Sequence, residues 1–278
     1  MSLHGRLLNL GVTTYQEAHD VQLQLHAARV ANRIEDVLVL TEHFPIYTLG
    51  RTTRPEHVGA GWEGKSINGI ALCISDRGGS VTYHGPGQIV GYPILALRQY
   101  CAGPKAYIHL LEEALIRSLA ILGIKSARRP GTPGVWVKDH KIGAVGVRIS
   151  RGVTRHGFAL NVVNTLEPFS AVLPCGLVGC TVTSVAMEAD RLVPLTDGRE
   201  AVVRRPGVRD LHGARRRPPS ELLLHARCGC RRSGRPHDRG LRRAAGIRAV
   251  RARVRRPRRT PVRLLHGRDA VDDEVPTR

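Results

Sequence analysis

The residues that build a hydrophobic core are unevenly distributed along this chain of 278 residues. Every Phe, Tyr and Trp lies before residue 204. Residues 1–203 carry 20 Lys+Arg and 16 Asp+Glu, whereas residues 204–278 carry 23 Arg, no Lys and 7 Asp+Glu, so the formal net charge of +20 is concentrated in the last segment. A segment without aromatic side chains buries too little apolar surface to offset its ordering entropy. We therefore expect one globular domain at 1–203 and a disordered, Arg-rich tail at 204–278.

The Arg-rich tail admits two explanations. A frameshifted reading of GC-rich coding DNA would produce it, because Arg, Ala, Gly and Pro have GC-rich codons and Lys, which the tail lacks, does not. Residues 196–203 begin a helical pattern with Asp197 as its cap, and Arg204-Arg-Pro206 interrupts this pattern. The alternative is a basic arm for nucleic acid, but the tail has no aromatic side chains for base stacking and no folded nucleic-acid motif. We favour a frameshift or a disordered extension and do not expect nucleic acid as a partner.

The rest of the composition bears on the compartment. No run of about 18 apolar residues occurs, so we expect no transmembrane helix and no membrane partner. The N-terminus lacks a hydrophobic signal core, which favours a cytoplasmic protein. The cysteines follow no disulfide-framework spacing and are interpreted as thiols; they stand at 73, 101, 175, 180, 228 and 230. Cys228-Gly-Cys230 lacks two further ligands at a zinc-site spacing, so we expect no metal site.

Hydrophobic periodicity predicts two helices among many short strands. Ala18, Val21 and Leu25 recur at spacings of three and four residues, and Thr14 precedes them as a helix cap. The helices are expected at 14–32 and 105–122, and the strands at 37–40, 46–49, 70–74, 90–95, 135–137, 142–149 and 158–163. Short, mostly hairpin-linked strands with few helices are typical of an α+β domain.

Two glycine-rich runs contain most of the polar residues that can form a site. Residues 77–88 read Arg-Gly-Gly-Ser-Val-Thr-Tyr-His-Gly-Pro-Gly-Gln, and residues 141–158 begin with the last lysine of the chain and end at His156, Gly157 and Phe158. A plain turn between strands is the usual explanation for paired glycines. This mixture instead favours a backbone that approaches a ligand closely while polar side chains hold its headgroup. Neither run matches a dinucleotide or phosphate loop.

Cys175 and Lys141 are the candidate reactive residues. Most cysteines are small buried hydrophobes, but Pro174 and Gly176 favour a turn that presents the Cys175 thiol. Most lysines are solvated surface charges, whereas Lys141 opens an apolar run. A lysine ammonium close to a thiol stabilises the reactive thiolate, and a poorly hydrated amine can act as a base. His84 and His156 are rival bases, and the sequence leaves the choice between them open.

These motifs closely resemble the lipoyl(octanoyl) transferase family of the lipoate/biotin ligase-like superfamily, over residues from about 5 to about 200. The Arg-Gly-Gly-x-x-Thr-Tyr-His-Gly-Pro-Gly-Gln signature of the family stands at 77–88. Its lysine-led stretch begins at Lys141 and continues to Asn161, and its Pro-Cys-Gly turn is Pro174 to Gly176. The resemblance implies a mixed sheet flanked by helices.

The resemblance also implies a reaction, the first step of endogenous lipoate synthesis. An octanoyl group on the phosphopantetheine arm of acyl carrier protein would pass to Cys175 as a thioester. It would then pass to a lysine on the lipoyl domain of a 2-oxoacid dehydrogenase or on the glycine cleavage H protein. Lys141 would lower the thiol pKa and move the proton; no cofactor is implied, and we expect a monomer. The implied substrate-binding residues are Arg77, Gly78, Gly79, Ser80, Val81, Thr82, Tyr83, His84, Ala144, Val145, Gly146, Gly157, Phe158 and Ala159.

Three alternatives remain at this point. An ATP-dependent lipoate ligase of the same fold works through an acyl-adenylate and needs no cysteine nucleophile, so the Pro174-Cys-Gly176 turn argues against it. An amidotransferase that moves lipoyl or octanoyl between carrier proteins also uses a cysteine and differs in its donor. A nucleic-acid-binding protein would use the basic tail and would bind independently of Cys175.

Overall fold

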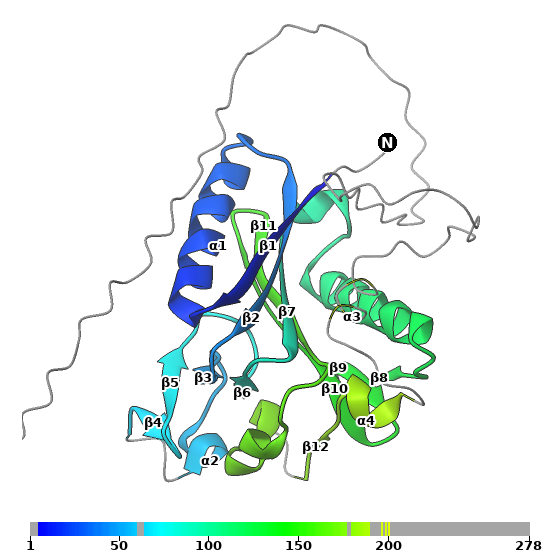
Figure 1. Ribbon diagram of the computed structural model, residues 1–278. Helices are drawn as coiled ribbons and strands as arrows, with labels where there is room; N and C mark the ends of the chain where they lie inside the picture. Colours follow the sequence, from blue (N-terminus) through cyan, green and yellow to red (C-terminus); the bar gives the residue numbers. More distant parts are fainter. Residues whose placement is uncertain are drawn as a thin grey trace, which may run out of the picture. The chain divides into compact units, whose positions relative to one another are not determined.

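One large mixed sheet supports the molecule, and the computed structural model describes residues 5–59, 64–176 and 179–189, with the single positions 196, 198 and 200 (Figure 1). In spatial order its strands are β1 (Gly5–Thr13), β2 (Asp36–His43), β7 (Gln88–Ile94), β11 (Val153–Asn161), β10 (His140–Ser150), β9 (Thr132–Val137) and β8 (Ala127–Arg129), with β12 (Thr181–Val182) paired to β10. A second sheet has the order β4 (Ser66–Ile67), β5 (Ile70–Ile74), β3 (Ile46–Leu49) and β6 (Val81–His84).

Two long helices cover opposite faces of the large sheet (Figure 1). Helix α1 (Tyr15–Val30) packs with Val37 and Val39 of β2, whereas α3 (Pro104–Ile121) packs with Leu38 and Leu40 of the same strand. Successive side chains of a strand point to opposite faces, so a continuously apolar strand supplies both cores. The short helices are α2 (Pro55–Val58) and α4 (Val185–Glu188), and the 3-10 turns are Leu97–Gln99, Glu167–Ala171 and Pro174–Gly176.

Both long helices begin where the sequence predicts. The Thr14 hydroxyl accepts a hydrogen bond from the Glu17 backbone N–H, and the Glu17 carboxylate accepts one from the Thr14 N–H, which completes a capping box. Pro104 occupies the first turn of α3, where its missing N–H costs nothing, and the left-handed Gly123 follows the helix end. The predicted α+β class, with a mixed sheet flanked by helices, is confirmed.

Several predicted strand limits were wrong. The run 141–158 forms a single hairpin, in which Ser150 pairs with Val153 and the left-handed Arg151 and Gly152 form the two-residue turn. The strand predicted at 158–163 therefore starts earlier, at Val153, and ends at Asn161. Strand β1 was not predicted, because its apolar and polar residues do not alternate. In the structure, the consecutive residues Leu7 and Leu8 are both exposed, so the strand has no single buried face.

The C-terminal predictions fall largely outside the described residues. Positions 196, 198 and 200 are helical, and a Cβ on Gly198 would lie 3.1 Å from Val162 and 3.2 Å from Ile89. Asp197, the boundary at residue 203 and the tail at 204–278 are not among the described residues. Within the described part, no helix has the length and apolar character needed to cross a membrane.

A buried ion pair ties α1 to the start of β2. The Arg29 Nε lies 2.6 Å from Asp36 Oδ1, and both side chains are buried. Asp36 also accepts hydrogen bonds from the Tyr100 hydroxyl at 2.7 Å and from the Ala96 N–H at 3.0 Å. The carboxylate thus joins the end of α1 and the start of β2 to the segment at 96–100, which is about 60 residues away in sequence.

We predict that Asp36→Ala lowers the free energy of unfolding by about 3–5 kcal/mol, because it leaves the Arg29 guanidinium buried without its counter-charge. Urea unfolding followed by circular dichroism measures the loss. The control is Arg6→Ala, since the Arg6–Glu35 pair is exposed and should contribute less than about 1 kcal/mol. Equal, small losses in both variants would contradict the prediction.

Candidate functional site

A cavity of about 440 Å³ lies where the glycine-rich loop at 77–82 crosses the large sheet. Its lining comes from that loop, from β10 and β11, from Val90 and Tyr92 of β7, from Tyr15 of α1 and from the start of α3. This volume lies within the range of small-ligand sites, which are concave and mostly apolar with a few placed polar groups.

Most of the predicted binding residues line this cavity. They are Arg77, Gly78, Gly79, Ser80, Thr82, His84, Ala144, Val145, Gly146, Gly157, Phe158 and Ala159. Val81 and Tyr83 do not line it, because alternation along β6 turns them into the core of the smaller sheet. There Tyr83 packs against Tyr47 and edge-on against Phe169. The family motif thus contains both cavity-lining and core residues.

The glycines allow the loop to lie directly on β10. The Gly78 N–H donates to the Val147 carbonyl at 2.9 Å, and a Cβ on Gly146 would lie only 2.8 Å from the Gly78 carbonyl oxygen. Arg77 has a structural place beneath the loop, where its guanidinium donates to the Thr48 carbonyl at 2.6 Å and to the Thr48 hydroxyl. The sequence predicts that these glycines let the backbone approach a ligand. In the structure, Gly78 and Gly146 also let the loop backbone approach the backbone of β10.

His84 is buried with both ring nitrogens hydrogen-bonded. The Gln88 side-chain NH₂ donates to the Tyr83 carbonyl and to the Asn161 side chain, so the Gln88 Oε1 accepts a hydrogen bond from His84 Nδ1–H at 2.7 Å. His84 Nε2 then accepts from the Thr48 hydroxyl at 3.2 Å. Burial, with added repulsion from His43 and Arg77, holds the pKa of His84 well below its usual value. Of the two rival bases, His84 is thus committed to structure.

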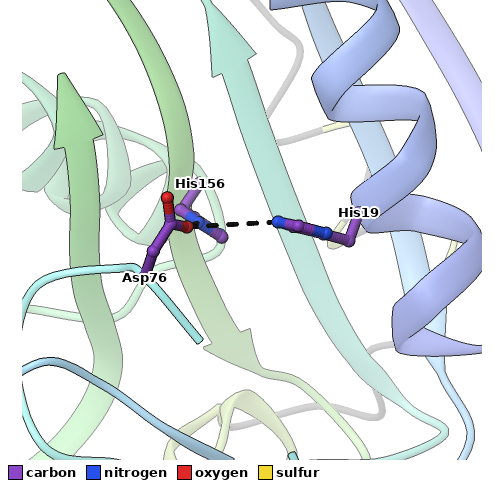
Figure 2. Close-up of side chains that lie close together, drawn as sticks. All are labelled: His19, Asp76 and His156. Atoms are coloured by element: carbon purple, nitrogen blue, oxygen red, sulfur yellow. Dashed lines mark hydrogen bonds and ion pairs between the residues drawn. The ribbon is translucent and has the colours of Figure 1, made fainter. Parts of the chain in front are cut away.

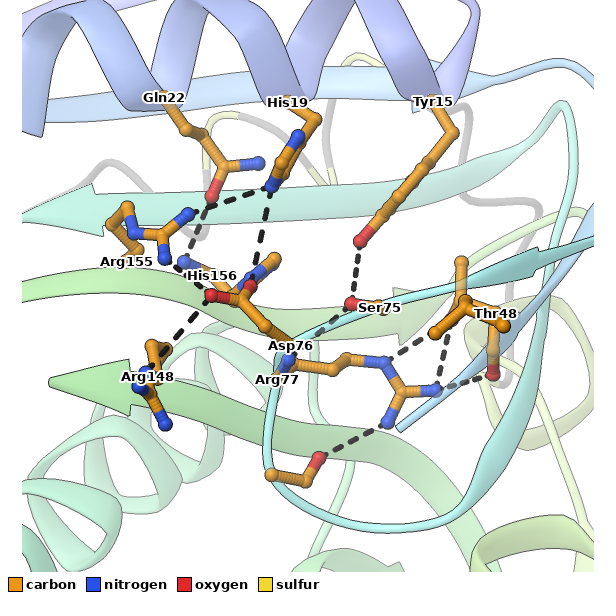
Figure 3. A network of polar contacts seen from close by, with 12 residues as sticks. Tyr15, His19, Gln22, Thr48, Ser75, Asp76, Arg77, Arg148, Arg155 and His156 are labelled. Carbon is orange, nitrogen blue, oxygen red and sulfur yellow. Dashed lines mark hydrogen bonds and ion pairs between the residues drawn. The ribbon is translucent and has the colours of Figure 1, made fainter. Parts of the chain in front are cut away.

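His156 is held differently, in a polar cluster beside the cavity (Figures 2 and 3). Its Nε2 lies 2.6 Å from Asp76 Oδ1, its backbone N–H donates to the Gln22 side chain, and its φ of 54° is left-handed. Within the described residues, its buried Nδ1 has no hydrogen-bond partner. Burial lowers the pKa of His156 even though Asp76 opposes this effect.

The same cluster has the composition of a cation site, but arginines already use its carboxylate. His19, Asp76 and His156 offer ligand atoms within 4.8 Å of one another (Figure 2). Arg155 donates to Asp76, and Arg148 lies 3.9 Å from it. The hydrogen bond from His156 and the charge of Arg155 hold the pKa of Asp76 far below its usual range. A further cation beside two guanidinium groups would be repelled, so we interpret the cluster as an ion-pair network.

Lys141 is buried at the start of β10, with 4% of its surface exposed. Its Nζ donates to the Pro133 carbonyl at 2.7 Å and lies 5.3 Å from the centre of the Trp136 ring. Gly134 makes room for this ammonium, because a Cβ there would lie 2.4 Å from Lys141 Cε. The Gly134 N–H in turn donates to the buried Glu112 carboxylate of α3 at 2.8 Å. The lysine is therefore fixed in one place by its surroundings.

The Pro174–Gly176 turn borders the pocket of Lys141. A small pocket is lined by Lys141 and Pro174 together with Thr82, Ala144 and Ala159, and the last three also line the main cavity. The backbone of the turn is held by a hydrogen bond from the Gly176 N–H to the Leu173 carbonyl at 2.9 Å. The side chain of Cys175 lies outside the described residues. The lysine and the turn that carries the cysteine, 34 positions apart, thus meet at one end of the cavity.

Sequence reasoning missed several residues of the site. His57 lies against the turn, since a Cβ on Gly176 would be 2.7 Å from its Cε1, and its Nδ1 lies 2.6 Å from the Ser80 hydroxyl. Tyr15 and Tyr92 line the cavity, and Thr48 and Asn161 join its hydrogen bonds. No local pattern marks them, because each becomes part of the site only when separate elements pack together.

Known proteins resemble this chain in both sequence and fold. Residues 14–205 match the lipoyl protein ligase A/B catalytic domain family. An octanoyltransferase of Acidobacterium capsulatum is 44% identical over 195 residues, which cover 66% of this chain and 79% of the relative. An octanoyltransferase of Chloroflexus aurantiacus is 44% identical over 201 residues, which cover 71% of this chain and 90% of the relative. A solved lipoate-protein ligase A bound with ATP superimposes with a TM-score of 0.55 at 22% identity, over 72% of this chain and 83% of that one, which supports the fold alone.

The buried histidines predict that acid destabilises the domain. Burial lowers the pKa of His43 to about 4, and the pKa values of His84 and His156 are lowered as well. As the pH falls below about 6.5, the unfolded chain takes up protons that the folded chain refuses, so stability falls between about pH 6.5 and 4. Each histidine that stays neutral should cost on the order of 2 kcal/mol at pH 5 relative to pH 7.

Urea unfolding at several pH values measures this slope. His43→Gln should reduce the loss of unfolding free energy between pH 7 and pH 5 by the contribution of one histidine. His140 is exposed, so His140→Gln should leave this loss unchanged. A stability independent of pH between 7 and 5 would show that these rings are not held neutral.

Proposed function

The chain is an acyltransferase of the lipoyl protein ligase A/B catalytic domain family, and we propose that it transfers an octanoyl group through a thioester on Cys175. The donor is octanoyl-acyl carrier protein, and the acceptor is a lysine on the lipoyl domain of a 2-oxoacid dehydrogenase or on the glycine cleavage H protein. The observation that carries the proposal is the shared pocket of Lys141 and Pro174, which opens beside a cavity of suitable size.

The first half-reaction moves the acyl group to the protein. The Cys175 thiolate attacks the carbonyl carbon of the donor thioester, and the tetrahedral intermediate collapses with release of the pantetheine thiolate. Lys141 stabilises the attacking thiolate as an ammonium and then protonates the leaving thiolate. A buried ammonium needs a defined partner, and the Pro133 carbonyl with the Trp136 ring supplies one.

The second half-reaction moves the acyl group to the acceptor lysine. The acceptor amine must be neutral to attack, so a proton acceptor is required, and Lys141 in its neutral form fills this role. The amide bond forms as the Cys175 thiolate leaves. Exchange between thioesters is nearly balanced and amide formation is downhill, so the reaction needs neither ATP nor a cofactor.

The cavity contributes to binding mainly through the acyl chain. An octanoyl group offers about six methylenes, and each buried CH₂ contributes roughly 0.8 kcal/mol, which gives on the order of 5 kcal/mol. A ligand chain buried under the 77–82 loop is also shielded from water, which slows hydrolysis of the thioester.

We predict that octanoyl-acyl carrier protein adds one octanoyl mass to the purified chain and that Cys175→Ala abolishes the adduct. Intact-mass spectrometry measures both. Cys180→Ala is the matched control and should still acylate, because its thiol stands outside the Pro-Cys-Gly turn. An adduct on Cys175→Ala would contradict the assignment of the nucleophile, whereas octanoylation of a lipoyl domain from octanoate and ATP, without acyl carrier protein, would contradict the proposal and favour a ligase.

Lys141→Gln should lower the single-turnover acylation rate by about 10²–10⁴-fold, the usual contribution of a positioned acid–base group. Lys141→Arg should not restore the rate, because a guanidinium holds its proton and cannot give it to the leaving thiolate. Gly134→Ala should also slow acylation, since its Cβ displaces the Lys141 side chain. The rate of Lys141→Gln should rise with pH toward that of the parent as the thiolate fills. A rate equal to that of the parent at pH 7 would remove Lys141 from the mechanism.

A further inference from the structure

The end of the cavity remote from Lys141 is polar. Tyr15, Tyr92 and His156 line it, and all three are buried. The Tyr15 hydroxyl lies 2.7 Å from the Ser75 hydroxyl, and the Tyr92 hydroxyl lies 2.6 Å from His43 Nε2. Figure 3 shows Tyr15 extending from α1 to Ser75 and His156 of β11 lying beside Asp76. Two of these polar groups are therefore satisfied within the protein.

His156 differs from the two tyrosines because it retains an unused acceptor. Asp76 is a carboxylate, so the proton between the two groups belongs to His156 Nε2, and Nδ1 carries the lone pair. In the described part of the chain, no group donates to this buried nitrogen. The ring is also fixed, since Gln22 holds its backbone N–H and His19 stacks on it at 5.8 Å. A fixed acceptor with no donor, on a ring that lines a cavity, points to a contact made when a ligand or water enters.

The distance from the acyl carbonyl to His156, measured along β10, can be compared with the length of the acyl chain; this comparison rests on the proposed function. The acyl carbonyl is placed at the residues common to the two pockets, which include the paired residues Ala144 and Ala159. Val147, which pairs with His156, is three residues further along, or roughly 10 Å at about 3.3 Å per residue. An extended eight-carbon chain spans roughly 9 Å, from seven C–C bonds of about 1.5 Å in a zigzag. The eighth carbon therefore arrives at His156.

We propose that His156, held in place by Asp76, terminates the acyl site at about eight carbons and prefers a hydrogen-bond donor to a further methylene. A longer alkyl chain would press its last methylenes against an unsatisfied nitrogen and an ion-pair network. A chain of the same length that ends in a hydroxyl would instead donate to Nδ1. His156 is thus a specificity-determining residue, at the end of the cavity opposite the reacting atoms.

Two donors of equal heavy-atom count test the polarity of this end. Acyl carrier protein is loaded with 8-hydroxyoctanoyl or with nonanoyl, and acylation of the parent chain is followed by intact mass after octanoyl transfer is established. In an apolar end the buried hydroxyl would slow the reaction roughly tenfold to a hundredfold. We expect the hydroxyl chain to react at least as fast as nonanoyl. A nonanoyl chain faster by tenfold or more would overturn the proposal.

Variants test the limit on length. His156→Leu should raise the decanoyl-to-octanoyl rate ratio at least tenfold and abolish the advantage of the hydroxyl chain. His156→Asn tolerates the left-handed backbone, is shorter, and should also raise the ratio, so it serves if the leucine variant does not fold. His26→Leu is the matched control, since His26 also lies on α1 but hydrogen-bonds the Ser150 carbonyl and does not line the cavity, and it should keep the parent ratio.

The outcomes separate the two proposals. Octanoyl transfer with an unchanged length preference in both His156 variants would overturn the assignment of His156 alone. Absence of any octanoyl adduct on the soluble parent would overturn the proposed function and the assignment together.

Discussion

A buried chain of hydrogen bonds joins the two sheets, and the arrangement of the cavity depends on it. It begins in the glycine-rich loop and ends at the backbone of the candidate catalytic lysine. In order, its members are Arg77, Thr48, His84, Gln88, Asn161, Thr183 and Lys141. Each buried polar group has a donor or acceptor in the next, so none pays the full desolvation cost. This chain of hydrogen bonds thereby fixes the position of the 77–82 loop relative to Lys141 at the end of the cavity.

This network requires its histidine to be neutral. His84 donates through Nδ1 and accepts through Nε2, and a second proton would leave the Thr48 hydroxyl facing a donor. Burial opposes protonation of His84, and the nearby His43 and Arg77 add to this effect. The cationic side chains of the site, in contrast, each donate to an oxygen acceptor. Lys141 has the Pro133 carbonyl, and Arg155 has the Asp76 carboxylate.

The cavity thus has two chemically different ends. One end places the buried Lys141 side chain beside the Pro-Cys-Gly turn, and the other carries the His156 imidazole, which is hydrogen-bonded to the Asp76 carboxylate. The sheet between them is lined by small residues, including Ala144, Gly146 and Ala159, which leave room for an alkyl chain. A solved lipoate-protein ligase A bound with ATP shares this fold at 22% identity, and a fold by itself does not determine a reaction. Under the proposed function, the chemistry depends on a few side chains at the end with the lysine.

The sequence by itself determined the family, the α+β class and most of the cavity lining, because these rest on local patterns. Paired glycines, a helix cap at Thr14 and a Pro-Cys-Gly turn are readable from neighbouring residues alone. Tertiary structure decided which side chains of the motif face the cavity, since Val81 and Tyr83 follow the strand alternation into the core. It also determined the different surroundings of His84 and His156, because their hydrogen-bond partners Gln88 and Asp76 are brought in by packing. The meeting of Lys141 with the turn at Pro174 also depends on tertiary structure, because β12 pairs with β10 through residues such as Lys141 and Val182, which lie 41 positions apart, and no local pattern encodes this pairing.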